Sequence, residues 1–185
     1  RSLFSGFYDI TERKLVEGQV LQRNMQLAAL NRISQELAQL AEPGEIYELI
    51  YNEIGQILDN RNLSVALYDE ATHQISFPID TIEGERRPVA SRPFGNGLTE
   101  YILRHKSPLL IPHAVDAETK KLGIAHAGRS AESWMGVPLL VGDKAIGAIT
   151  LQDYQRADTY SSAQLELLST IAGQAAIALE NARLF

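Results

Sequence analysis

The sequence predicts an α+β fold in α/β/α layers, with a central, mainly antiparallel sheet of about five to six strands and long N- and C-terminal helices. In the block 133–154, two apolar, β-prone runs flank Gly142-Asp143-Lys144, a pattern typical of an antiparallel hairpin. Apolar side chains occupy both faces of both runs. We therefore expect helices to cover the sheet on its two sides.

Residues 11–41 contain no proline and a single glycine, Gly18, and so predict a long helix. Glu42-Pro43-Gly44 interrupts it, and Pro43 suits the first turn of a second helix over 43–58. Ser161 and Gln164 form a capping-box pattern that opens a last helix toward the C-terminus.

The middle of the chain alternates between strand and helix patterns. Asn96 is a candidate cap for a short helix through Lys106. The remaining expected elements are strands over 63–69, 74–80 and 108–112, a surface loop over 83–93 and a short helix near 117–122.

One stretch of the long N-terminal helix has the three-four spacing of a heptad seam: Leu30, Ile33, Leu37 and Leu40. Such a stripe can pack on its own domain or form a parallel dimer helix. A helix of roughly 30 residues exceeds what one small domain covers, which favours the dimer. We therefore expect a homodimer through the N- and C-terminal helices.

Composition removes several function classes. The formal net charge is −6, and the arginines of the 83–93 loop are interspersed with acids, so we expect solvated loop charge rather than nucleic-acid binding. No apolar run suits a membrane span, and we expect no direct membrane contact from this segment. The chain has no cysteine, which removes disulfides, thiolate metal sites, iron–sulfur clusters and thiol nucleophiles and fits a cytoplasmic location.

Two regions resemble known families. The run Asp9-Ile10-Thr11-Glu12-Arg13-Lys14 resembles the C-terminal end of PAS domains. Residues 133–154 together with the ending Ala175-Ala-Ile-Ala-Leu-Glu-Asn-Ala-Arg183 resemble a bacterial GAF domain, a small sensory module. We therefore expect a PAS remnant and connecting helix over 1–26 and a GAF domain over 27–185.

The resemblance implies a piece of a multidomain sensor. Such modules usually precede a histidine kinase or a cyclic-di-nucleotide synthase or hydrolase. The chain itself holds none of those output motifs, so the output domain is expected beyond Phe185.

The family's known cofactors are narrowed by the residues present. Covalent bilin attachment and free-methionine sulfoxide reductase chemistry use cysteine in this family. The cyclic-nucleotide motif Asn-Lys-x-x-x-Phe also has no counterpart here. Haem-binding members use histidine, and His113 and His126 lie in the variable loop. A lone loop histidine is more often solvated than a ligand, so we expect no haem or metal there.

The resemblance places a ligand pocket between the sheet and the segments before the hairpin. The residues expected to line it are Ala66, Tyr68, Phe77, Ile79, Phe94, Leu98, Tyr101, Ile111, Trp134 and Met135. These side chains either surround a small molecule or simply fill the space, leaving a ligand-free dimerisation and coupling scaffold. Both interpretations stay open.

No nucleophile elbow, phosphate loop or paired-carboxylate pattern occurs in the chain. We therefore predict that the segment is not an enzyme. Its expected function is to bind a small molecule, to transmit a signal through flanking helices, or both.

Overall fold

The computed structural model describes residues 42–125 and 129–184. In chain order the elements are α2 (Pro43–Ile57), β1 (Leu63–Asp69), β2 (Gln74–Ile82), β3 (Glu85–Arg86), β4 (Arg92–Pro93), α3 (Leu98–His105), β5 (Leu109–Ile111), α4 (Val115–Lys121), β6 (Ser133–Val141), β7 (Lys144–Asp153) and α5 (Ser162–Leu184).

The sheet is antiparallel throughout, with strand order β3-β2-β1-β7-β6-β5 and β4 paired to β2. β6 and β7 form the predicted hairpin around Gly142, whose φ of +57° suits a residue without a side chain. The α+β fold with an antiparallel sheet is therefore confirmed.

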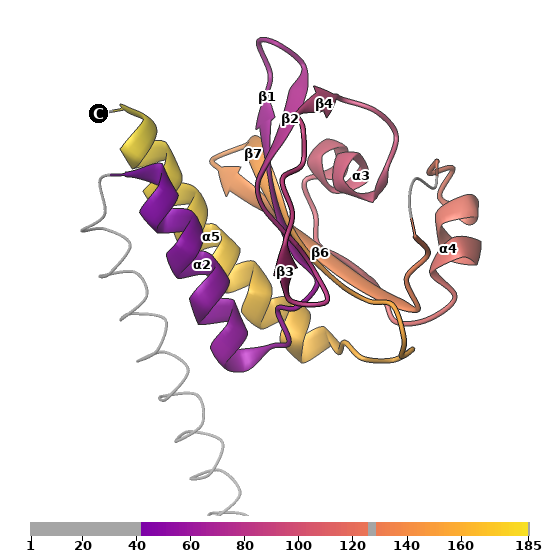
Figure 1. The fold of residues 1–185 in the computed structure, drawn as a ribbon. Coiled ribbons are helices and arrows are strands. Elements are labelled where there is room, and N and C mark those ends of the chain that lie inside the picture. Colours follow the sequence, from indigo (N-terminus) through magenta and orange to yellow (C-terminus); the bar gives the residue numbers. More distant parts are fainter. Residues whose placement is uncertain (1–41, 126–128, 185) are drawn as a thin grey trace, which may run out of the picture.

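Helices cover the sheet on both sides (Figure 1). α2 and α5 lie together on one face, where the largest buried cluster joins Ile46, Ile50 and Leu168 to strand residues such as Val65 and Ile149. α3 and the segment around α4 lie on the other face, over two smaller clusters centred on Ile102 and Leu103. Since both faces are buried, neither has the polar alternation of a solvent-facing strand.

β2 carries a bulge. Val65 pairs with Ile79 and Leu67 with Ser76, so Phe77 and Pro78 together stand opposite Ala66. Proline has no N–H for the ladder and is tolerated in a strand at such an irregularity. The extra residue reverses which side chains face which layer, so Phe77 and Asp80 point to the α3 side while Ile79 points to α2 and α5.

The start of α3 differs from the expectation. Gly97, not Asn96, is the N-cap residue. The Asn96 side chain instead donates to the Gly123 carbonyl at 2.8 Å and accepts from Arg104 at 2.9 Å. The capping box at the start of α5 is confirmed, because Ser161 N donates to Gln164 Oε1 at 2.8 Å and Gln164 N donates to Ser161 Oγ at 3.4 Å.

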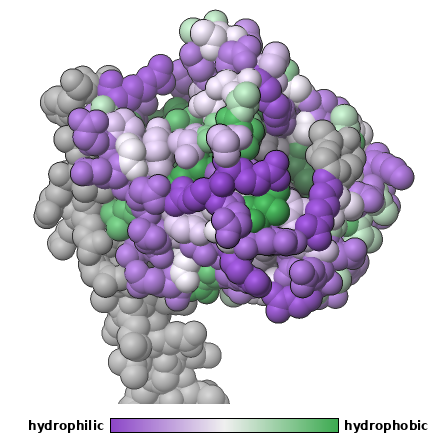
Figure 2. Space-filling view, viewed as in Figure 1, coloured by the Kyte–Doolittle hydropathy of each residue, from purple (hydrophilic) through white to green (hydrophobic). Residues whose placement is uncertain are grey.

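Polar loops surround the apolar interior. On the face seen in Figure 2, apolar side chains show mainly in a hollow edged by hydrophilic ones. Among the described helices, none is both long and apolar enough to cross a bilayer. The expected dimer residues Leu30, Ile33, Leu37 and Leu40 and the PAS-like run lie outside the described residues.

Candidate functional site

A cavity of about 200 Å³ lies on the α3 side of the sheet. Its sheet side is formed by Ser64 and Asp80 with neighbours on β2, β6 and β7, and its walls come from the first turn of α3 and from α4 with the loop after it. The sheet side chains that line it are Ser64, Phe77, Asp80, Trp134, Thr150 and Gln152.

Three polar residues form one row across adjacent strands. Asp80 on β2 pairs with Ser64 on β1, and Ser64 pairs with Thr150 on β7. The Ser64 hydroxyl is fully buried, and no partner lies within hydrogen-bond distance of it in the described part of the chain. A buried hydroxyl without a partner is costly in a folded protein, so this atom is a candidate for contact with a ligand.

Asp80 is the second unusual group of the row. Burial raises the pKa of its carboxyl, and the nearby Ser64 hydroxyl and the Arg87 charge only partly oppose this rise. No ion pair to Asp80 occurs within 4.0 Å among the residues that the structure describes. The cavity therefore holds a carboxyl group without a close ion pair, on which the Arg87 charge acts only from a greater distance.

Trp134 supplies an aromatic surface. The indole is buried, with 4% of the residue exposed, and lies against Gly136. A side-chain carbon added at Gly136 would meet the indole Cη2 atom and Ile102 Cδ1, each at 2.6 Å. The glycine therefore makes the space that the ring occupies.

Glu100 fixes the opposite wall. Its carboxylate is buried and accepts hydrogen bonds from Gly95 N at 3.0 Å, from Gly97 N at 3.1 Å and from the Arg92 guanidinium. Burial opposes ionisation and is the largest single influence on this group. The bonds from Arg92 and the backbone outweigh it, so the pKa of Glu100 is lowered. The carboxylate ties β4 to the start of α3, and both charges are already satisfied.

The remaining cation of the cavity lining lies at its edge. Arg129 donates to Glu83 at 2.9 Å, and its guanidinium lies 4.4 Å from the centre of the Tyr154 ring. Arg129 and Arg92 are therefore both paired with carboxylates.

Comparison with protein families places the site in context. The family model described as GAF domain matches residues 41–180. This chain belongs to the GAF domain family. It is thus a module of the kind found in signalling proteins.

Solved structures of low sequence identity share the fold. The GAF domain of an Acinetobacter phosphoenolpyruvate-protein phosphotransferase is 20% identical with a TM-score of 0.70, covering 87% of this chain and 96% of that one. Residues 122 to 287 of a methyl-accepting chemotaxis protein are 16% identical with a TM-score of 0.70, covering 82% and 97%. Free methionine-R-sulfoxide reductase from Neisseria meningitidis, in complex with its substrate, is 14% identical with a TM-score of 0.66, covering 88% and 93%.

The reductase corrects one prediction. The segment was expected not to be an enzyme because it holds no familiar catalytic motif, yet an enzyme has the same fold. Fold and missing motifs therefore do not exclude catalysis in a GAF domain.

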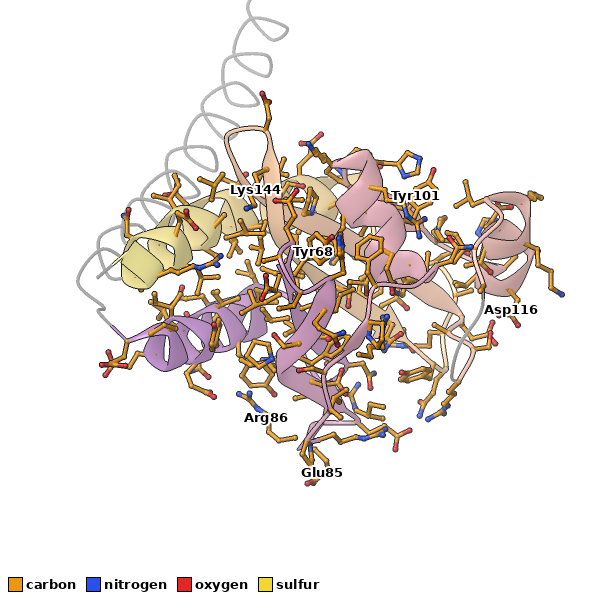
Figure 3. All side chains as sticks on the ribbon, turned by 90° about the horizontal axis from the view of Figure 1, so that it is seen from above. Tyr68, Glu85, Arg86, Tyr101, Asp116 and Lys144 are labelled. Atoms are coloured by element: carbon orange, nitrogen blue, oxygen red, sulfur yellow. The ribbon has the colours of Figure 1, made fainter. Side chains whose placement is uncertain are left out.

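The structure brings together only part of the predicted lining. Phe77, Leu98 and Trp134 line the cavity. Ala66, Tyr68 and Phe94 pack instead in a neighbouring cluster with Leu103 of α3, and Ile111 packs beside Trp134 in the cluster around Ile102. Tyr101 stacks on the exposed His105 ring, with ring centres 3.9 Å apart (Figure 3).

Two predicted lining residues lie on the wrong face. Ile79 and Met135 belong to the cluster under α2 and α5, so the expectation that they line the GAF cavity is wrong. For Ile79 the reason is the β2 bulge, which reverses the alternation after Phe77. For Met135 the reason is simpler: neighbouring residues of a strand point to opposite faces, and Trp134 already faces the cavity.

The polar lining residues were missed by sequence reasoning. Ser64, Asp80 and Thr150 are polar positions in strongly apolar strands, which was the available signal, but their meeting depends on strand register. Glu100 was missed because a glutamate in the first turn of a helix is usually solvent-exposed, whereas here it is buried and accepts from Arg92 of β4 and from Gly95 and Gly97.

The histidine candidates give no metal site that can be described. His113 Nδ1 lies 2.8 Å from Asp158 Oδ1 at an exposed position. Within residues 42–125 and 129–184, no group of three histidine or carboxylate side chains is placed to hold a metal ion. His126 lies outside the described residues.

Proposed function

We propose that this GAF domain binds a small molecule in the cavity between the sheet and α3, and that binding changes the packing of α5. The observation that carries the proposal is the pair Ser64 and Asp80. One is a buried hydroxyl that makes no hydrogen bond of ordinary geometry, although it lies near enough to the Asp80 carboxyl to lower its pKa. The other is that carboxyl, which has no ion pair within 4.0 Å among the described residues, and both groups line the same cavity. A ligand that supplies the missing partners would remove both costs.

A short covalent path leads from the cavity to α5. Gln152 of β7 lines the cavity, and the next residue, Asp153, organises the connection to α5. Asp153 accepts hydrogen bonds from Gln155 N at 2.8 Å, Arg156 N at 2.9 Å and Thr159 Oγ1 at 3.1 Å. A ligand shifts a conformational equilibrium only if it prefers one state, so we propose that it prefers one placement of this connection.

We also propose that this domain is one module of a larger sensor protein. The resemblance of residues 9–14 to a PAS end and the heptad stripe at Leu30, Ile33, Leu37 and Leu40 support a homodimeric sensor protein, with a histidine kinase as the output. On α5 itself, Ile177 is 56% exposed, which leaves an apolar side chain for a partner helix.

Trp134 offers a direct test of binding. It is the single tryptophan of the chain and lines the cavity, so its fluorescence reports on the site. We expect that, in a panel of one-ring and two-ring compounds of positive, zero and negative charge, some raise the melting temperature and change this fluorescence.

Two matched variants make the test specific. Ser64→Leu fills the cavity and should abolish both signals, whereas Ser91→Leu adds the same bulk at an exposed loop position and should leave them intact. Circular dichroism establishes that both variants are folded. Absence of any binding to the wild-type protein would overturn the proposal in favour of a ligand-free scaffold.

A further inference from the structure

We propose that the ligand of this cavity is a small planar molecule with a positively charged N–H group, such as an amidinium, a guanidinium or a protonated amino-heterocycle. This inference rests on the proposed function and narrows it to one chemical class. Its two anchors are Asp80 for the charge and Trp134 for the ring.

The charged side chains of the lining are nearly all paired. Four charged side chains line the cavity: Asp80, Arg92, Glu100 and Arg129. Arg92 is paired with Glu100, and Arg129 with Glu83. Asp80 remains as the one lining charge without an ion pair in the described part of the chain.

This balance selects against an anionic ligand. A carboxylate or phosphate group would meet the negative charge of Asp80, and both arginines would have to leave existing partners before binding it. The first turn of α3 offers no better anion site, because Glu100 already accepts from Gly95 N and Gly97 N. A cation, in contrast, gains a partner without breaking any pair.

Hydrogen-bond acceptors lie in a row along the sheet side of the cavity. Asp80 and Ser64 face each other across neighbouring strands, and Thr150 follows on the next strand of the same row. A carboxylate with two oxygens binds a planar N–H fork in two parallel hydrogen bonds, which gives geometry as well as energy. The Ser64 hydroxyl can accept a further N–H bond or donate to a ring nitrogen.

The cavity has the size of a small aromatic ligand. A cavity of about 150 Å³ accommodates benzene, and this one measures about 200 Å³, which allows one ring with a polar substituent or a small fused ring. Trp134 lines it and supplies an aromatic ring, whereas the Phe77 ring already has the Arg92 guanidinium over it, 5.4 Å from the ring centre. A positively charged planar group is attracted to aromatic faces, most strongly to that of tryptophan.

Three probes of nearly equal shape test the charge preference: benzamidine (cationic), benzamide (neutral) and benzoate (anionic). We expect benzamidine to bind the wild-type chain about tenfold or more tighter than the other two, measured by calorimetry and by Trp134 fluorescence. Asp80→Asn keeps the size of the side chain and removes its charge, and should lower benzamidine affinity by about tenfold or more. Asp143→Asn makes the same change in the β6–β7 turn and should leave the affinity unchanged.

The outcomes separate this inference from the proposed function. If benzoate or benzamide binds the wild type as tightly as benzamidine, or Asp80→Asn keeps the preference for benzamidine, the cationic class is overturned and the binding cavity stands. If neither these probes nor any compound of the wider panel binds, the proposed function fails and this inference fails with it. Ser64→Ala, which retains the carboxylate, should weaken benzamidine less than Asp80→Asn does.

Discussion

The Trp134 indole occupies the space above Gly136 that any larger residue would fill. An added carbon at Gly136 would lie 2.6 Å from the indole Cη2 atom and 2.6 Å from Ile102 Cδ1. Ile102 is fully buried in α3, so its Cδ1 atom is enclosed by other core side chains. This glycine therefore sets the position of both the aromatic surface of the cavity and the α3 layer.

Gly136→Ala should destabilise the fold by about 1–3 kcal/mol, the usual cost of overpacking a closed core. It should also displace Trp134, which shifts the tryptophan emission. Chemical denaturation and fluorescence measure the two effects. Gly173→Ala is the matched control, because nothing lies within 4 Å of a carbon added on that exposed part of α5. It should be stabilising by roughly 0.5–1 kcal/mol. Equal stability of Gly136→Ala and wild type would contradict the assigned close packing.

Glu100→Gln should lower stability at neutral pH by about 1.5–3 kcal/mol, because Arg92 and two backbone N–H groups lose a charged acceptor. The pKa of Glu100 is lowered in the folded state from an ordinary 4.5. The stability that ionised Glu100 contributes is therefore fully present above pH 4.5 and is lost as the pH falls through the lowered pKa of the folded state. Denaturation across the acid range should show the two proteins converging only below pH 4.5.

Glu118→Gln serves as the control for Glu100. Glu118 pairs with Lys121 on the exposed side of α4 at 2.6 Å. A solvent-exposed pair of this spacing contributes no more than about 0.5 kcal/mol, so this variant should match the wild type at every pH. A loss in Glu100→Gln no larger than in Glu118→Gln would mean that the buried carboxylate does not hold the cavity wall.

Asp80→Asn should raise the stability of the ligand-free protein at neutral pH, by about 0.5–2 kcal/mol. The pKa of Asp80 is raised by burial, so its ionised form costs stability, and that cost appears as the pH rises through the folded value. Below the ordinary 3.8 the carboxyl is protonated in both states, and the gain should vanish. Thermal denaturation of Asp80→Asn and of the wild type at a series of pH values measures this difference in stability. A loss of stability in Asp80→Asn at neutral pH would show instead that the carboxylate is satisfied in the fold.

The contrast between β6–β7 and β2 shows what sequence reasoning reaches. The hairpin depends on local turn residues and on the apolar pattern of its two strands, so its existence and approximate bounds could be predicted. The β2 bulge was not predicted, although Pro78 within the strand pattern was a signal for it. One extra residue in β2 was enough to place Asp80, and not Ile79, in the cavity.

The candidate site depends still more on distant pairing. Ser64 and Thr150 lie on β1 and β7, which are far apart in the chain, and they become neighbours only through strand register. Three predicted lining residues, Phe77, Leu98 and Trp134, were apolar and identifiable from the family pattern. The polar residues Ser64, Asp80 and Thr150 provide the hydrogen-bonding groups of the cavity. No local sequence pattern indicates the strand register that brings them together.

The connection between β7 and α5 is held by Asp153, which we expect to couple the cavity to the output helix. The residue is 9% exposed, and its carboxylate accepts hydrogen bonds from Gln155 N, Arg156 N, Arg156 Nε and Thr159 Oγ1. Burial opposes its ionisation most strongly, yet these bonds together lower its pKa. Asp153→Ala should therefore cost about 1–3 kcal/mol and increase hydrogen exchange over 154–162.

The decisive measurement compares ligand binding with the response of α5. In Asp153→Ala the cavity residues are unchanged, so a probe such as benzamidine should still alter Trp134 fluorescence, while the ligand-induced change in α5 hydrogen exchange should be lost. Gln155→Ala is the control within the same connection, because Asp153 uses only its backbone N–H. It should respond as the wild type does. If α5 still responds to ligand in Asp153→Ala, the coupling between the cavity and α5 does not depend on Asp153. The direct packing of α5 on β6 is then the candidate route, since both elements contribute to the same buried cluster.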